Sequence, residues 1–269
     1  MLSRIKLSAK NDLQIVFWCN VVKGTRPLLL LHGHGGDHRG LLKLAKQLPV
    51  ITFVLDLPGF GDSDELETHT IDEYVAAIEA FATQQNLTEY DVCGHSLGSA
   101  FALALAAHDS RVHKLILINP IPEFAAMIRK LIQLLSGTAT KLPPRLGEAL
   151  VHTRMYSIVT FLLHSQKKLD LGHAGRYMHA QNTAKYSLKA WQESGNAIYG
   201  MDQKSYAADV NAPTLIIHGD KDKMTSLKAV KSFVSVFKNA KLERLPKAGH
   251  FAAFENVDEV ARLIEPFLK

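Results

Sequence analysis

The chain has 269 residues, of which 47% are hydrophobic and 21% are charged, and its formal net charge is +5. This balance is typical of a globular protein with a buried core, and no apolar run approaches the ~20 residues that a membrane-spanning helix needs. The two cysteines, Cys19 and Cys93, form no disulfide framework, and the stretch 1–6 lacks the apolar centre of a secretory signal. We therefore expect a cytoplasmic protein without stable membrane insertion.

The predicted elements begin with a hairpin, in which strands over 5–7 and 13–18 flank a short turn. Short apolar runs then alternate with segments of helical periodicity. In chain order these are strand 28–31, helix 41–48, strand 51–55, helix 71–81, strand 90–93, helix 99–107 and strand 112–118. An alternation of this kind predicts an α/β fold with a doubly wound, mostly parallel sheet.

The alternation stops at Ile121, and no core strand is predicted from there to Ala207. It resumes with strand 214–217, helix 227–237, strand 241–245 and helix 257–268, which brings the sheet to eight strands. We predict that residues 1–120 and 208–269 form the core, and that 121–207 is a helical lid inserted after the sixth strand. The lid carries 11 Lys and Arg against 5 Asp and Glu. Without an aromatic-basic motif, this charge does not predict nucleic-acid binding.

The stretch Gly94-His95-Ser96-Leu97-Gly98 lies between a predicted strand and a predicted helix. A strand that turns directly into a helix at a serine strains the backbone of that serine and exposes its hydroxyl at the positive end of the helix. The flanking glycines avoid collisions with the neighbouring strand and helix. The pattern therefore predicts a nucleophile elbow with Ser96 as the nucleophile.

A serine nucleophile needs a base and an acid that orients the base. The loop after strand 214–217 holds Asp220 and Asp222, and either carboxylate could orient a histidine. His250 is the only histidine after these aspartates, and it follows the last predicted strand. Both loops are expected at the same edge of the sheet as Ser96, because the carboxyl ends of parallel strands meet there. These residues are therefore predicted to form a catalytic triad.

At this point the chain resembles the α/β-hydrolase family over nearly its whole length outside the predicted lid. The stretches that carry the resemblance are the elbow 94–98, the loops 32–36 and 56–63, and the pairs Gly219 with Asp222 and Gly249 with His250. The family's Gly-x-x-Asp pattern selects Asp222 over Asp220 as the acid. One departure is the stretch 223–226, where many relatives carry a proline and this chain has none.

The resemblance implies that the backbone N–H groups of His34 and Leu97 form the oxyanion hole, and that no cofactor is bound. It implies a serine hydrolase of a small acyl substrate, with a carboxylic ester favoured. Phe251, after the base, matches an aromatic position of carbon–carbon bond hydrolases of the meta-cleavage type, so that reaction stays an alternative. Two further alternatives are a cofactor-free perhydrolase and, from a different class, a non-catalytic binding module on the same fold.

Further candidate binding residues are Phe251 and two arginines of the predicted lid. Arg154 and Arg176 each lie among aromatic and histidine neighbours, where a guanidinium could hold a carboxylate. The alternative is that these charges form a solvated face. The histidines at 34, 38 and 95 are the nearest approach to a metal-binding pattern, but no carboxylate or cysteine completes a ligand set, so we expect no metal. The substrate's identity and the oligomeric state stay open.

Overall fold

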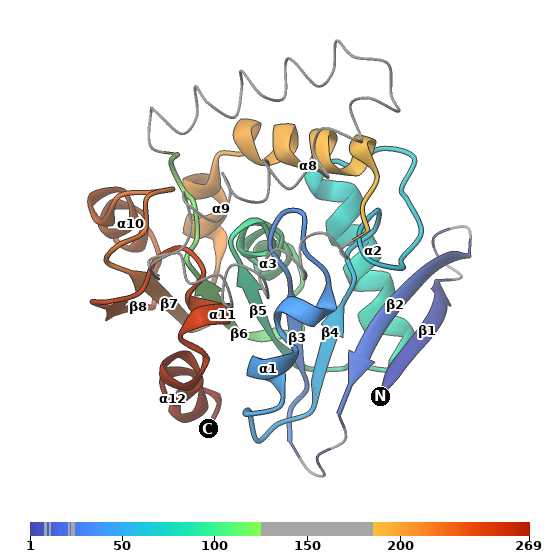
Figure 1. The fold of residues 1–269 in the computed structure, drawn as a ribbon, viewed down its shortest axis with the longest axis horizontal. Helices are drawn as coiled ribbons and strands as arrows, with labels where there is room; N and C mark the ends of the chain where they lie inside the picture. The colour runs from blue at the N-terminus through green and yellow to red at the C-terminus, as the bar shows by residue number, and fades with distance from the viewer. Residues whose placement is uncertain (8–9, 11, 21, 23–24, 125–184) are drawn as a thin grey trace, which may run out of the picture.

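The computed structural model describes residues 1–7, 10, 12–20, 22, 25–124 and 185–269. In this part of the chain, eight strands form one sheet in the order β1-β2-β4-β3-β5-β6-β7-β8 (Figure 1). The strands are β1 (Leu2–Leu7), β2 (Leu13–Cys19), β3 (Leu28–Leu31), β4 (Thr52–Leu55), β5 (Tyr90–His95), β6 (Val112–Ile118), β7 (Thr214–Gly219) and β8 (Ala240–Leu245). β2 is antiparallel to β1 and β4, and the other neighbours are parallel. The predicted eight-stranded, mostly parallel sheet is confirmed.

Helices cover both faces of this sheet. They are the 3-10 turn η2 (His38–Gly40) and the α-helices α1 (Leu42–Ala45), α2 (Ile71–Gln84), α3 (Leu97–His108), α8 (Leu188–Gly200), α9 (Gln203–Asp209), α10 (Leu227–Val234), α11 (Ala252–Glu255) and α12 (Val257–Leu268). In β3, Leu29 and Leu31 join the core that includes α2 and α3, whereas Leu28 and Leu30 join the core that includes α1 and α12. The apolar run is fully buried, because alternate side chains point to opposite faces and both faces are covered.

Some elements differ in length from the prediction. The helix expected over 41–48 is reduced to the single turn α1, because the chain enters it through η2 and Pro49 disfavours a helix in the residue before it. β5 and β7 continue to His95 and Gly219, beyond their predicted ends. The residues that follow these two strands therefore start directly at the carboxyl edge of the sheet.

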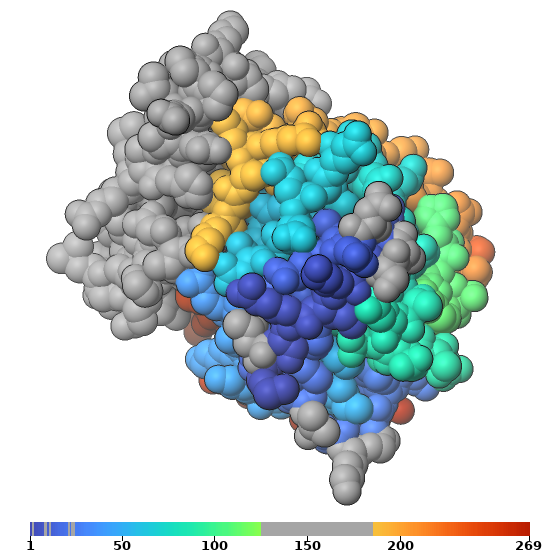
Figure 2. Space-filling model, turned by 90° about the vertical axis from the view of Figure 1, so that its right-hand side faces the viewer, coloured from blue at the N-terminus to red at the C-terminus, as the bar shows by residue number. Residues whose placement is uncertain are grey.

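The predicted lid falls mostly on residues 125–184, which lie outside the described residues. Its described end, 185–207, contains α8 and most of α9. This end packs on the segment between β4 and α2 (Figure 2). The Ser187 hydroxyl donates to the Glu65 carboxylate at 2.6 Å. The lid as a whole stays a prediction. Among the described helices, none is both long and apolar enough to cross a membrane.

Candidate active site

Ser96 joins β5 to α3 in a backbone conformation that residues other than glycine rarely adopt. Its φ is 55° and its ψ is −117°, and such a residue persists only where its surroundings fix it. A Cβ on Gly94 would lie 2.1 Å from the Gly98 oxygen, and a Cβ on Gly98 would lie 2.3 Å from the Leu31 oxygen. Glycine is therefore required at both positions for β5, α3 and β3 to meet around Ser96.

Ser96, His250 and Asp222 form one chain of hydrogen bonds. The Ser96 Oγ is 2.7 Å from His250 Nε2, and His250 Nδ1 is 2.8 Å from Asp222 Oδ2. Because an ionised carboxylate only accepts, Nδ1 carries the ring proton and Nε2 accepts from the serine hydroxyl. The three side chains come from the segments after β5, β8 and β7, so the topology of the sheet brings them together.

Asp220 and Asp222 both follow β7 but have different partners. Arg244 donates to the two carboxylate oxygens of Asp220 at 2.8 and 2.7 Å. Asp222 Oδ1 accepts from a backbone N–H two residues on at 2.7 Å, and its Oδ2 accepts from Asn119 Nδ2 at 2.9 Å. Burial raises the pKa of Asp222, but the adjacent His250 ring and the donated hydrogen bonds outweigh burial and lower the pKa to about 2. The carboxylate against His250 is therefore ionised at neutral pH.

His95, beside Ser96 in the turn, supports the segment that carries His250. Its Nε2 donates to the backbone oxygen of His250 at 2.9 Å, and the two ring centroids are 5.5 Å apart. Burial, and then the neighbouring His250 ring, lower the pKa of His95 to about 4. The neutral ring therefore contributes a hydrogen bond and no charge at pH 7.

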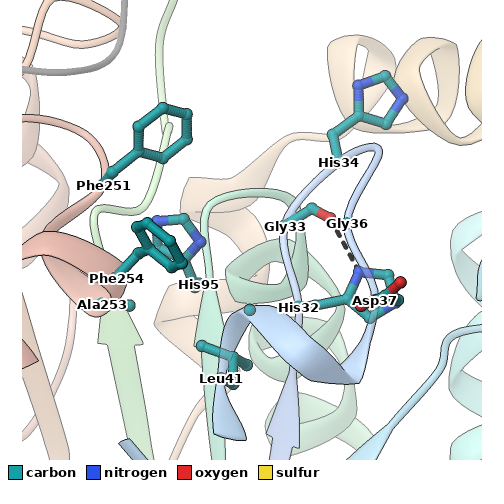
Figure 3. Close-up of a pocket in the computed structure, with 11 residues that line it drawn as sticks. His32, Gly33, His34, Gly36, Asp37, Leu41, His95, Phe251, Ala253 and Phe254 are labelled. Carbon is teal, nitrogen blue, oxygen red and sulfur yellow. Dashed lines mark hydrogen bonds between the residues drawn. The ribbon is translucent and has the colours of Figure 1, made fainter. Parts of the chain in front are cut away.

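The predicted oxyanion donors lie on two different elements. Leu97 is the first residue of α3, so its N–H has no partner within that helix. The His34 side chain points toward α8 (Figure 3), where its Nε2 donates to the Trp191 carbonyl at 2.7 Å and its ring stacks on the indole at 4.9 Å. Burial lowers the pKa of His34 to about 4. The neutral ring thus ties the loop after β3 to α8, and its backbone N–H stays a predicted donor.

A cavity of about 80 Å³ opens beside the loop after β3. Gly33, Leu41, His95, Phe251 and Phe254 form much of its wall (Figure 3). Phe251, a predicted substrate contact, therefore lines a small and largely apolar space next to the turn that holds Ser96. A substituent of a few carbon atoms suits such a wall better than a charged group does.

One group of described side chains has the spacing of metal ligands, namely Asp37, His38 and Asp56. Asp56 Oδ1 accepts from the backbone N–H and the Nδ1 of His38, both at 2.7 Å, and Asp56 Oδ2 accepts from the Asp62 N–H at 3.0 Å. Asp37 accepts from the Arg39 guanidinium at 2.9 Å. Protein donors therefore engage the oxygens that a cation would use, and the group braces the loop after β3 against the loop after β4.

Two predicted contacts are not described by the structure, and two residues near the site were not predicted. Arg154 and Arg176 lie outside the described residues. Asn119 and His95 hold neighbours of Ser96, yet the sequence analysis assigned them no such role. The signal for Asn119 is its place directly after an apolar strand, at the edge where the other site residues were expected.

The sequence matches a family model described as alpha/beta hydrolase fold over residues 26–257. It is 26% identical to 2-hydroxymuconate semialdehyde hydrolase of Pseudomonas putida, over 90% of this chain and 86% of the relative. It is 25% identical to Lipase 1 of Psychrobacter immobilis, over 87% of this chain and 74% of the relative. Among solved structures, an esterase from Exiguobacterium antarcticum has a TM-score of 0.83 at 17% identity, covering 100% of this chain and 99% of that chain.

Proposed function

The chain belongs to the α/β-hydrolase family, and we propose that it is a serine hydrolase that cleaves a small carboxylic ester through an acyl-enzyme on Ser96. The observation that carries the proposal is the pair of hydrogen bonds from Ser96 Oγ to His250 Nε2 at 2.7 Å and from His250 Nδ1 to Asp222 Oδ2 at 2.8 Å. A serine is activated when a base lies within hydrogen-bond reach and a third group holds that base in one tautomer.

In the acylation step, Ser96 Oγ attacks the carbonyl carbon of the ester while His250 Nε2 takes the hydroxyl proton. The carbonyl oxygen becomes an oxyanion, which the backbone N–H groups of His34 and Leu97 stabilise. His250 then gives the proton to the departing alcohol oxygen as the bond from carbon to that oxygen breaks. Asp222 stays ionised and stabilises the imidazolium that forms between the two proton transfers.

In the deacylation step, a water molecule attacks the acyl carbon on Ser96. His250 takes a proton from the water and returns it to Ser96 Oγ when the carbon–oxygen bond to the serine breaks. The products are one carboxylic acid and the free enzyme. The small apolar cavity lined by Phe251 supports a short hydrocarbon substituent on the substrate.

The test is covalent labelling together with turnover. A fluorophosphonate probe should modify Ser96, identified by peptide mapping, and the protein should hydrolyse aryl esters of short acids. Ser96→Ala should lose the label and about 10³-fold or more of kcat, whereas Ser205→Ala, at an exposed serine of α9, should keep both. If labelled protein carries the probe elsewhere, or if Ser96→Ala keeps near-normal turnover, the proposal is wrong.

The second candidate is hydrolysis of a carbon–carbon bond in a vinylogous diketone, and the similarity to 2-hydroxymuconate semialdehyde hydrolase favours it. Both reactions use the same Ser96, His250 and Asp222, so labelling does not separate them. The two reactions are separated by the ratio of kcat/KM for an aryl ester to kcat/KM for a vinylogous diketone. A preference for the diketone of about 100-fold, or about 3 kcal/mol of transition-state stabilisation, would replace the ester assignment.

A further inference from the structure

We propose that Asn119 is a positioning residue, which holds the acid Asp222 and the segment of the base His250 at the separation that the reaction requires. The inference rests on the proposed function. Asn119 Nδ2 donates to Asp222 Oδ2 at 2.9 Å and to the Gly249 oxygen at 3.3 Å. One amide group therefore contacts the acid and the residue directly before the base.

The topology explains why such a bridge is useful. Asp222 follows β7 and His250 follows β8, so the acid and the base belong to different loops. Asn119 directly follows β6, the neighbour of β7 on the other side (Figure 1). Its side chain is fully buried, and its own N–H donates to the Ile217 oxygen at 2.8 Å. The bridge therefore starts from a rigid strand end and not from a third loop.

The orientation of the amide is set by its partners. Both atoms that face Nδ2, Asp222 Oδ2 and the Gly249 oxygen, are acceptors, so the flipped amide would place oxygen against oxygen. In the orientation present, Asn119 Oδ1 is buried and, among the described residues, has no hydrogen-bond partner. A buried acceptor without a partner destabilises the folded state. This unfavourable burial accompanies the orientation in which one N–H of the amide points to the acid and the other to the segment of the base.

A second local penalty lies in the backbone of the same residue. Asn119 has a φ of 47°, in the left-handed region, which is unfavourable for residues with a Cβ and least so for asparagine. This turn directs the side chain back across the end of β7. Asn119 thus has two unfavourable features, the unpaired Oδ1 and the left-handed backbone. Both accompany the same pair of hydrogen bonds from Nδ2, which indicates that the structure keeps them because the bridge between the acid and the base segment needs them.

Other contacts that hold these two loops act on the main chain. Lys221 N–H donates to the Ala248 oxygen at 3.0 Å, and His95 donates to the backbone oxygen of His250 at 2.9 Å. Asp222 Oδ2 is different, because Asn119 and His250 both donate to this one oxygen. Among the described side chains, the amide is therefore the group that fixes the carboxylate oxygen used by the base.

The first test removes the amide without straining the backbone. Asn119→Gly permits the left-handed conformation, and it should lower kcat for an aryl ester by about 10- to 100-fold while KM stays within about threefold, because a misplaced catalytic group slows the chemical step. The rate of fluorophosphonate labelling at Ser96 should fall with kcat. Asn86→Gly is the matched control, since Asn86 is exposed, follows α2 and has a φ of 55°. It should leave kcat and labelling unchanged.

The second test keeps the shape of the side chain and changes its chemistry. In Asn119→Asp, two carboxyl groups lie against each other and do not both ionise, so the pair should bind an extra proton and the pH profile of kcat/KM should differ from that of the wild type. The other titratable rings near the acid are His95 and His218, whose Nδ1 is 3.9 Å from Asp222 Oδ2. Burial lowers the pKa of both rings.

The outcomes separate the two proposals. If wild-type Ser96 is neither labelled nor active on any ester, the proposed function fails, and this inference fails with it. If the wild type is active but Asn119→Gly keeps kcat and labelling within about twofold, Asn119 is structural only. If Asn119→Gly does not fold, Asn119→Asp decides, because a pH profile of kcat/KM identical to that of the wild type also overturns the inference.

Discussion

Asp220 and Asp222 occupy the same loop, and their partners give them opposite expected roles. Asp220 is held by Arg244, whereas Asp222 is buried against His250 with its pKa lowered to about 2, after the adjacent ring and hydrogen bonds outweigh the effect of burial. Asp222→Asn should lower kcat by about 10⁴-fold, because an amide stabilises the wrong imidazole tautomer. Asp220→Asn removes an exposed salt bridge, which contributes little to stability, and should keep kcat. Steady-state kinetics of both variants are the measurement. A larger loss of kcat in Asp220→Asn than in Asp222→Asn would assign the role of the acid to Asp220.

The positions of the candidate residues follow from their order along the chain, but their contacts do not. Ser96, His250 and the two aspartates were placed at one edge because each follows a predicted parallel strand. The choice of Asp222 over Asp220 came from the family resemblance, since the pairing of Asp220 with Arg244 depends on how β7 and β8 align. The contact of Asn119 with Asp222 depends on one positive φ, which residue patterns do not encode. The catalytic roles themselves stay predictions.

α3 lies unusually close to β3, and Gly98 is the point of contact. A Cβ at Gly98 would lie 2.3 Å from the Leu31 oxygen, whereas a Cβ at Gly200, the last residue of α8, would meet nothing within 4 Å. Gly98→Ala should lower the free energy of unfolding by about 1–3 kcal/mol or more, because backbone must shift. Gly200→Ala should leave it unchanged or raise it by up to about 1 kcal/mol. Urea unfolding of both variants is the measurement. Equal changes in the free energy of unfolding would contradict the close contact of α3 with β3 at Gly98.

β5 carries Ser96 after its carboxyl end and a buried carboxylate, Asp91, near its amino end. Asp91 is 2% exposed, its Oδ1 has no hydrogen-bond partner among the described residues, and the nearest Arg26 nitrogen is 3.8 Å away. Burial raises the pKa of Asp91 to about 6, although Arg26 and Lys114 oppose the rise. The folded state therefore favours the protonated carboxyl, and stability falls as pH rises from about 4 to about 6, by at most about 3 kcal/mol.

Asp91→Asn removes this titration while keeping the shape of the side chain. The difference in melting temperature, variant minus wild type, should grow between about pH 4 and about pH 7 and then level off. Turnover should be unaffected, because Asp91 lies at the opposite end of β5 from Ser96. Thermal unfolding across this pH range is the measurement, and a difference that does not change with pH would mean that Asp91 titrates normally.

The existence and type of most elements could be predicted from the sequence, and their lengths less well. The apolar run 28–31 and the pattern over 257–268 coincide with β3 and α12. The helix expected over 41–48 was too long, because leucine periodicity does not register the turn η2 or the effect of Pro49. Lengths at element ends depend on caps and neighbouring loops, which local hydrophobic patterns do not contain.

The charge of the whole molecule is distributed unevenly. The predicted lid 121–207 has 11 Lys and Arg against 5 Asp and Glu, while the rest of the chain has 20 against 21. If lid charges attract the substrate, kcat/KM for a carboxylate-bearing ester should fall as salt rises, while that for a neutral ester of equal length should not. Arg154→Ala and Arg176→Ala should reduce this difference, and Arg262→Ala in α12 should not. If both esters respond alike in all variants, the charges form a solvated face.

β6 and β7 are paired in register from Leu115 with Thr214 to Ile118 with Ile217, although the whole predicted lid separates them along the chain. During synthesis, six strands therefore leave the ribosome before β7, the strand that pairs with the open side of β6, has been made. At the usual elongation rate this interval is ~5–20 s, and throughout it an apolar strand edge is open to wrong partners. The nascent chain also carries Ser96 well before Asp222 and His250, its proposed acid and base, have been synthesised.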